Sequence, residues 1–519
     1  MTRSSRPILR FLVVAGVLVG TIGASWVAHP SRSVAAPSPS AAQTLTLGWN
    51  LETTTLDPVA DSGNADEWVQ VNLYDQLVKV GADGKSIVPD LATHWTITNN
   101  GLVYTFHLRP ALFSNGQKVT AYDVAFCLNR DRAKNALWSW TVSAIKTIRT
   151  PNPSTVTITL KHRWAPFLSD LSLSDGGVYP ESYFKKVGSS GMAIHPIGTG
   201  PYMLQQWRKG EFILLKKNPH YWWASRYPMK YVEFEVIPND NTRLLKAEAG
   251  QLDVDVGLPA NQAAQLHGNQ TVVPRLFKST RIIYFVPNLK TTPLKDPKVR
   301  QAINHAIDRR AMVKAILQGY GSPANSFMPK GAPDYDPNIP VPAYNLALAK
   351  KLMAQSSHPH GFTLPMTAGS GDIEGNEAAV IFKSEVAPLG INVSIRQMDP
   401  TAMLTAQENG HFTFTTNQWT NDISDPDELV SFAVDYTADH SWFSFYNNPT
   451  LTRLSHQAEI TINPAKRKQL YFRIQRIWAQ ASPYYALYYP LYIDGVNPKV
   501  HGFSQNPLGF FQLQGVTKS

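Results

Sequence analysis

The 519-residue chain has a single cysteine, Cys127, so it cannot form an intrachain disulfide. The spacing of Cys127 with Val124 and Leu128 is helical, which favours a buried core thiol. Stability must then come from hydrophobic cores. The length exceeds what one ordinary core organises, so we expect two or three lobes. Apolar residues make up 43% of the chain and charged residues 17%, as is typical of a folded globular protein.

Signatures of catalysis and of cofactor binding are also scarce. The sequence has no HExxH, CxxC or GxSxG motif. GADGKS at 81–86 lacks the first glycine of a phosphate-binding loop, because Lys79 stands there. IGTGPY at 197–202 lacks the third glycine of a dinucleotide fingerprint, because Met203 stands there. The HPHG stretch at 358–361 reads as an exposed loop rather than a metal site. We therefore expect no enzymatic activity, no cofactor and no metal site.

Strong charge of either sign is absent as well. The formal net charge is +10, and it falls to +6 without residues 1–36, which hold four arginines and no acid. The remaining basic pairs are scattered along the chain. This distribution favours a solvated surface over a nucleic-acid-binding stripe, so we expect no nucleic-acid partner.

Residues 1–36 have the pattern of an export signal. Three arginines precede the apolar run FLVVAGVLVGTIGASWVA, and small residues follow at 33–36. The run of 18 residues is also long enough to span a bilayer, so a cleaved signal and an uncleaved N-terminal anchor both remain open. No cysteine stands at the cleavage point, which excludes a bacterial lipoprotein anchor, and no later stretch resembles a membrane span. Residues 37–43 predict a flexible linker, and the folded part begins near Thr44. We expect an exported protein at the periplasmic or extracellular face of the membrane.

Strand and helix patterns alternate along the chain, which predicts a mixed α/β protein. Apolar residues alternate with others at 102–108, at 155–160 and at 231–236, as in half-buried strands.

Several helix starts are marked clearly. Asp296 and Pro297 predict an N-cap followed by a proline in the first helical position. Asn463 precedes a proline in the same way, and Thr120 with Asp123 predicts the start of the helix that carries the cysteine.

Four acidic residues follow Trp419 in the stretch WTNDISDPDE. Their spacing does not fit an EF-hand calcium loop, and Pro426 interrupts it. Asp425 and Glu428 have the positions of a capping box at a helix start. Asp422 is left over between a predicted strand and that helix, where ligands are often bound in α/β folds. Asp422 is therefore the candidate functional residue, and Trp419 is a candidate for lining a pocket.

Nine segments, in family order, resemble the family 5 extracellular solute-binding proteins of peptide-type ABC importers, which include oligopeptide-, dipeptide- and nickel-binding proteins. The segments are LDP with NLYDQLV after it (from 56), IVPDLATHW (87–95), FSNGQKVTAYDVAF (113–126), IGTGPYMLQQW (from 197), NPHYWW (218–223), AEAGQLDVD (247–255), VPNLKTTPLKDPKVRQAINHAIDR (from 286) and WTNDISDPD (from 419).

The resemblance implies an α/β fold of the periplasmic-binding-protein (clam-shell) type, with two lobes that close on a ligand about a hinge and an extra subdomain in the first lobe. The C-terminal YYALYYPLYIDG is expected to return to the first lobe. The expected division is 1–36 export signal or N-terminal anchor, 37–43 linker, 44–72 first lobe, 73–193 extra subdomain, 194–279 first lobe, 280–485 second lobe and 486–519 return to the first lobe.

The resemblance also implies a function. The protein would be the monomeric substrate-binding component of an ABC importer, capturing short peptides and delivering them to a membrane permease powered by separate ATPase subunits. In peptide-binding relatives the aspartate of the WxxD stretch pairs with the peptide's ammonium, which gives that role to Asp422. Gln418, Trp419 and Thr420 would then offer backbone groups to the peptide, and Trp419 would also wall a pocket.

The sequence departs from that pattern in one respect. Between His411 and Asp422 there is no Arg or Lys to pair with a peptide's carboxylate, and Arg396 is a candidate that nothing in the sequence places. The ligand's length therefore stays open, as does its class, since an oligosaccharide or a metal chelate such as a nickel complex would suit the same fold. An exported hydrolase is the alternative from another class.

Overall fold

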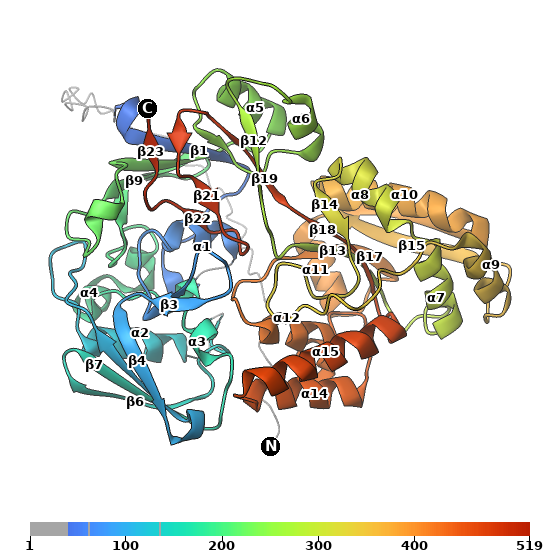
Figure 1. Cartoon of the computed structure of the whole chain (residues 1–519), viewed down its shortest axis with the longest axis horizontal. Coiled ribbons are helices and arrows are strands. Elements are labelled where there is room, and N and C mark those ends of the chain that lie inside the picture. Colours follow the sequence, from blue (N-terminus) through green and yellow to red (C-terminus); the bar gives the residue numbers. More distant parts are fainter. Residues whose placement is uncertain (1–39, 61–62, 134–135, 137) are drawn as a thin grey trace, which may run out of the picture.

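The computed structural model describes residues 40–60, 63–133, 136 and 138–519. Figure 1 shows two large bodies side by side, with a smaller one beside the first. Among the described residues, no helix is both long and apolar enough to cross a bilayer. The N-terminal run with the pattern of an export signal lies outside the described residues.

A seven-stranded sheet in the order β12-β19-β11-β1-β10-β9-β8 forms the first large body. Its strands are β1 (Thr44–Trp49), β8 (Tyr202–Arg208), β9 (Phe212–Lys217), β10 (Tyr231–Val236), β11 (Val254–Asp255), β12 (Val273–Phe277) and β19 (Tyr492–Val496). Leu45, Leu47 and Trp49 alternate along β1 and are all buried, as the period of two in a strand requires. The helices α1 (Asn64–Gln70), α5 (Asp240–Glu248) and α6 (Ala260–Gln265) belong to this body.

The smaller body contains a four-stranded antiparallel sheet in the order β4-β5-β7-β6. Its elements are β2 (Val78–Val80), β3 (Ile87–Pro89), β4 (Ala92–Thr98), β5 (Val103–Leu108), α2 (Ala121–Asp131), β6 (Ile145–Asn152), β7 (Thr155–Leu160), α3 (Phe167–Asp170) and α4 (Glu181–Met192). The predicted start of α2 is confirmed, since the Thr120 N–H donates to Asp123 at 3.0 Å. Cys127 on this helix is buried, as its spacing predicted.

The second large body has a six-stranded sheet in the order β14-β18-β13-β17-β15-β16. Its strands are β13 (Ile282–Pro287), β14 (Gly321–Pro323), β15 (Phe362–Gly369), β16 (Ile391–Met398), β17 (Phe414–Trp419) and β18 (Tyr485–Pro490). Its helices are α7 (Pro297–Ala306), α8 (Arg309–Leu317), α9 (Leu346–Ala354), α10 (Ile373–Val386), α11 (Pro400–Glu408), α12 (Pro426–Val434), α13 (Tyr436–Asp439), α14 (Pro449–Ile460) and α15 (Pro464–Ala481).

Helices cover both faces of this second sheet. Ile283 and Phe285 of β13 pack in the core that includes α7 to α10, whereas Ile282, Tyr284 and Val286 pack in the core that includes α12, α14 and α15. Figure 1 shows these two groups of helices on different sides of the sheet. Burial on both faces explains why the strand is apolar along its whole length.

The helix starts of the second body follow the predicted pattern. Asp296 accepts the Lys298 N–H at the start of α7, with proline in the first position. Asn463 accepts the Lys466 N–H at the start of α15 in the same way.

Two connections near the middle of Figure 1 join the large bodies. One runs from β12 to β13 and the other from β18 to β19. The sequence suggested a return to the first lobe at residue 486, but β18 still pairs with β13 and β14 in the second sheet, and the chain crosses at Leu491. Beside this crossing the Thr280 N–H donates to the Pro507 carbonyl at 2.8 Å, which ties the β12–β13 connection to the C-terminal segment.

Candidate functional site

β17 presents an unpaired edge. It pairs with β13 along its whole length, whereas its other edge pairs with β15 only at Phe414 and Thr415. In the part of the chain that the structure describes, no strand covers that edge from Thr416 to Trp419. Such an edge offers backbone N–H and C=O groups to an added strand. In the free protein the Gln418 N–H donates to Asn417 Oδ1 at 2.8 Å. The edge runs directly into the loop that carries Asp422.

The loop after β17 is fixed by the helix that follows it. Asp425 caps α12 by accepting the Asp427 N–H at 2.8 Å, as predicted. The Asp425 carboxylate also accepts hydrogen bonds from Nη1 and Nη2 of Arg467, at 2.5 and 2.7 Å. This fork-to-fork ion pair ties the start of α12 to α15 and gives Asp425 a structural role.

Glu428 behaves differently from the prediction. A capping box would direct its carboxylate to the Asp425 N–H. Instead, Glu428 accepts the Asp422 N–H at 3.1 Å and the Ile423 N–H at 3.1 Å. The loop folds back over the first turn of α12, so these two N–H groups reach the carboxylate. The predicted capping box is therefore wrong in its second half, and Glu428 positions the loop instead of the cap.

Asp422, which is half-buried, and Glu428, which is fully buried, form an acidic pair. Burial raises the pKa of Asp422 to about 6. Burial, followed by the negative charge of Asp422, raises the pKa of Glu428 well above its usual range. Since two adjacent carboxylates in a buried place cannot both ionise readily, the pair carries one negative charge near neutral pH. A cation bound there would meet a matching single charge.

The other predicted site residues lie beside this pair. The Trp419 ring packs against Phe432 and Trp442, with ring centres 5.0 and 4.9 Å apart. Its indole N–H is buried and has no hydrogen-bond partner among the described residues. Gln418 is exposed, and Thr420 is half-buried. These three residues and Asp422 form one continuous segment.

The loop after this segment contacts the smaller body. The Ser424 and Ser169 hydroxyls lie 2.7 Å apart. The Ala165 N–H donates to the Glu459 carbonyl at 2.6 Å, so α14 also reaches the smaller body. The Asp422 loop therefore lies where the two lobes meet.

Sequence reasoning missed one cation near the site. Arg281 donates from Nη2 to Gln418 Oε1 at 3.1 Å and to Glu374 Oε2 at 3.1 Å. Arg281 and Gln418 are 137 residues apart, and only the pairing of β13 with β17 brings them together. Arg396, the candidate from the sequence, is exposed on β16, and β15 lies between that strand and β17.

One group of described residues has the composition of a metal site. Ligand atoms of Asp435, His456 and Glu459 lie within 4.8 Å of one another. However, His456 Nε2 lies 2.7 Å from Asp435 Oδ2, and the other oxygen of Asp435 accepts the Thr437 N–H at 2.9 Å. An ion pair and a helix cap account for these contacts without a metal. The HPHG histidines belong to no such group among the described residues.

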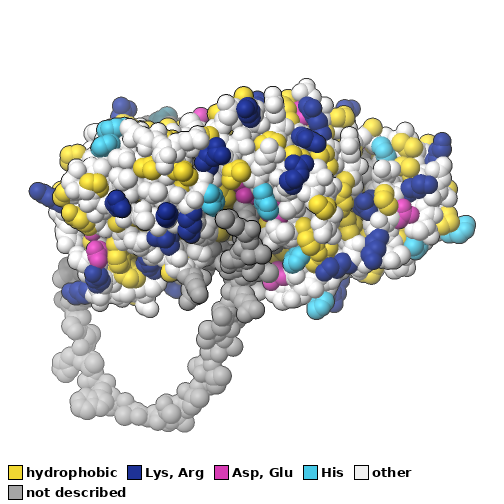
Figure 2. All heavy atoms as spheres, turned by 90° about the horizontal axis from the view of Figure 1, so that it is seen from below, with side chains coloured by type: hydrophobic (Ala, Val, Ile, Leu, Met, Phe, Trp, Pro, Cys, Tyr) yellow, Lys and Arg dark blue, Asp and Glu magenta, His cyan; other side chains and the backbone are white. Residues whose placement is uncertain are grey.

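The surface shows a mixed distribution of charge. Figure 2 shows Lys and Arg side chains over both lobes on the face it presents, interspersed with hydrophobic side chains.

Comparison with known proteins identifies the family. Residues 86–440 match the bacterial extracellular solute-binding proteins, family 5 middle. The chain belongs to this family. Among curated relatives, glutathione-binding protein GsiB of Escherichia coli O1:K1 / APEC is 27% identical to this chain over 475 residues. The match covers 88% of this chain and 90% of the relative. This chain is 25% identical over 475 residues to heme-binding protein A of Haemophilus influenzae, covering 86% of each.

Solved structures of family 5 proteins share the fold. The periplasmic binding protein DppA from Helicobacter pylori, in complex with the peptide STSA, has a TM-score of 0.80 and 26% identity, covering 92% of this chain and 98% of that one. NikA from Brucella suis, in complex with Fe(III)-EDTA, has a TM-score of 0.83 at 24% identity, covering 92% and 100%. The clam-shell fold expected from the sequence is confirmed, and the chain is a solute-binding protein of this type.

Proposed function

We propose that this protein captures short peptides between its lobes and delivers them to a membrane permease driven by separate ATPase subunits. The observation that carries the proposal is the unpaired edge of β17, which ends at the acidic pair of Asp422 and Glu428. A peptide has both complements, since its backbone can extend the sheet and its ammonium can neutralise the pair.

The predicted site residues then have separate roles. Asp422 holds the ammonium, and Gln418, Trp419 and Thr420 supply backbone groups to the added strand. Trp419 also walls the pocket for the first side chain, because its ring is held by Phe432 and Trp442. Glu428 does not touch the peptide but holds the backbone of Asp422 in place.

We also propose how the chain divides into lobes, where the protein acts and that it does not alter its ligand. The first lobe comprises residues 44–72 and 194–279 with the C-terminal return, 73–193 form the extra subdomain, and the second lobe begins at 280. The protein acts as an exported monomer, released or tethered by its N-terminal segment. It binds without altering the ligand, and incubation with peptide mixtures should yield no cleavage products by mass spectrometry.

Affinity for a peptide should depend on pH through Asp422. Its pKa is about 6 in the free protein, and an ammonium pairs with the ionised form only. Lowering the pH from 7 to 5 protonates Asp422 and should weaken binding about tenfold, while the peptide ammonium stays charged. Titration calorimetry of a tripeptide at the two pH values checks this. Equal affinity at both values would exclude Asp422 as the ammonium partner.

A ligand without a charge requirement would give a different result. An oligosaccharide would be bound by aromatic stacking and should tolerate the loss of Asp422 and the change of pH. The Asp422→Asn protein at pH 7 therefore separates a peptide ligand from a sugar ligand.

A further inference from the structure

The outer surface of α14 and α15 carries charge of one sign. Both helices pack apolar side chains into the same core of the second lobe, so their opposite faces lie on the outside of the molecule. Between 449 and 481 the one acidic residue is Glu459, which is buried. The exposed charged side chains of the two helices are Arg453, Lys466, Lys468, Arg473 and Arg476. The outer surface formed by these five residues, the α14–α15 surface, is therefore basic.

Acidic neighbours neutralise only part of this charge. Arg476 Nε lies 2.8 Å from Asp336 Oδ2. The half-buried Asp334 is close enough to interact electrostatically with Lys468. Three cations take part in no ion pair within the described residues, namely Arg453, Lys466 and Arg473. Because unneutralised cations on one face produce a positive potential together, the α14–α15 surface attracts an anionic partner.

The basic surface continues on the smaller body. Residues 138–169 contain no acid, and Lys161 and Arg163, which follow β7, are exposed. A Cβ atom placed on Gly101, in the turn between β4 and β5, would lie 3.3 Å from Ile462 Cγ2 and 3.9 Å from Arg163 Cγ. The turn between α14 and α15 and the cations of the smaller body therefore meet at Gly101. Figure 2 views the molecule from below, where α14 and α15 lie in Figure 1, and shows Lys and Arg side chains over both lobes with hydrophobic side chains between them.

Exposed isoleucines stand among these cations. Ile460 at the end of α14 is 42% exposed, Ile462 in the following turn is 40% exposed, and Ile97 of β4 is 47% exposed. An acidic protein surface or a nucleic acid would attract the cations but give no favourable contact to the isoleucines. A lipid surface suits both kinds of side chain, because phosphate headgroups attract cations and apolar side chains enter the boundary between headgroups and acyl chains. The combination favours a membrane as the partner.

We propose that the α14–α15 surface docks on a membrane that contains anionic phospholipids, with Ile460 and Ile462 at the headgroup boundary. α15 has 18 residues and is about 27 Å long, so it can lie along the membrane and bring several cations to the headgroups at once. One basic residue near an anionic membrane surface raises affinity about fivefold, so the three unpaired cations together account for about 100-fold. Docking would hold the protein near the permease of the proposed function, but it does not depend on which ligand the protein carries.

The test measures how the exported protein sediments with two kinds of vesicle. One kind is phosphatidylcholine alone, and the other contains about one third phosphatidylglycerol. At low salt the wild-type protein should bind the phosphatidylglycerol vesicles about 100-fold more tightly. Raising the salt from about 0.05 to about 0.5 M should remove most of this preference, because salt screens exposed charges.

Two variants separate the contributions of charge and of apolar side chains. The triple variant Arg453→Gln, Lys466→Gln and Arg473→Gln should lose most of the preference for phosphatidylglycerol. Ile462→Ser should weaken binding several-fold at low and at high salt, because the apolar contribution is not screened. A thermal melt verifies that each variant is folded. All variants keep the same N-terminal segment, so it affects every measurement equally.

The matched control combines Arg310→Gln, Lys350→Gln and Lys351→Gln. These exposed residues of α8 and α9 belong to the same lobe, and their replacement removes the same total charge. The control should bind both kinds of vesicle as the wild-type protein does. An equal loss of preference in the two triple variants would show that net charge alone matters, and it would overturn the assignment of the α14–α15 surface. Equal binding of wild-type protein to the two kinds of vesicle, or binding to neither, would overturn it as well.

Discussion

Asp422→Asn should weaken the binding of a short peptide by about 10²- to 10⁴-fold. The substitution keeps the size of the side chain but removes the charge that the peptide's ammonium needs. Breaking one side of a buried ion pair costs about 3–5 kcal/mol, because the remaining charge loses its partner away from water. The measurement is titration calorimetry with a tripeptide at pH 7, together with a thermal melt to verify folding.

Asp399→Asn is the matched control for this substitution. Asp399 is exposed at the start of α11 in the same lobe and caps that helix through the N–H groups of Thr401 and Ala402. Asparagine caps as well as aspartate does, so stability and affinity should both be unchanged. An Asp422→Asn protein that still binds the peptide as tightly as wild type would remove Asp422 from the role of ammonium partner.

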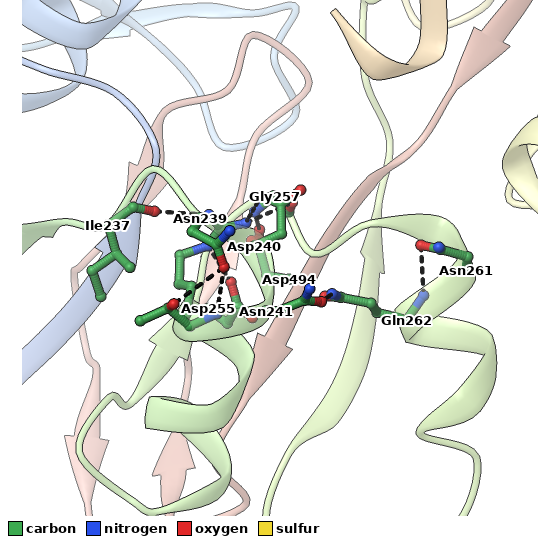
Figure 3. Close-up of polar contacts among 11 residues, drawn as sticks. Ile237, Asn239, Asp240, Asn241, Asp255, Gly257, Asn261, Gln262 and Asp494 are labelled. Atoms are coloured by element: carbon green, nitrogen blue, oxygen red, sulfur yellow. Dashed lines mark hydrogen bonds and ion pairs between the residues drawn. The ribbon is translucent and has the colours of Figure 1, made fainter. Parts of the chain in front are cut away.

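Arg243→Met should destabilise the first lobe by about 3–5 kcal/mol. Arg243 is fully buried, and Figure 3 labels its partners Ile237, Asp240 and Asp255. It contacts Asp255 at 2.5 Å, Asp240 at 2.9 Å and the Ile237 carbonyl at 3.0 Å. Methionine fills a similar volume but leaves the buried Asp255 carboxylate without a cation. Differential scanning calorimetry should show a large loss in melting temperature.

A double substitution tests the cause of this loss. In Arg243→Met with Asp255→Asn, the one carboxylate left without Arg243 is Asp240, which is 23% exposed, so part of the stability should return. Equal melting temperatures for wild type and the single variant would show that the network contributes nothing to the stability of the lobe.

The local features of this fold were accessible from sequence. Asp296 and Asn463 each precede a proline and mark helix starts, and both side chains accept the expected N–H groups. The alternating residues 155–160 form the strand β7 with its apolar side chains buried. Such signals depend on neighbours in the chain. Motifs that occur in family order along the chain allowed the family to be predicted, and with it the two-lobed architecture.

Features that depend on distant contacts were not accessible. Residues 484–493, YYALYYPLYI, have no charged side chain because both β18 and β19 are buried, so nothing in this run marks the crossing at Leu491. The Glu428 carboxylate accepts the N–H groups of Asp422 and Ile423 instead of the cap N–H, because the loop folds back on the helix. Arg281 enters the site through strand pairing across 137 residues. The sequence analysis could isolate Asp422 by elimination, but it could not find its neighbours.

Native mass spectrometry of the purified protein, followed by denaturation and identification of released molecules, tests the central claim most directly. The account predicts a set of short peptides with a free N-terminal ammonium, lost from the Asp422→Asn protein. Release of a single sugar or metal chelate, retained by Asp422→Asn, would contradict it.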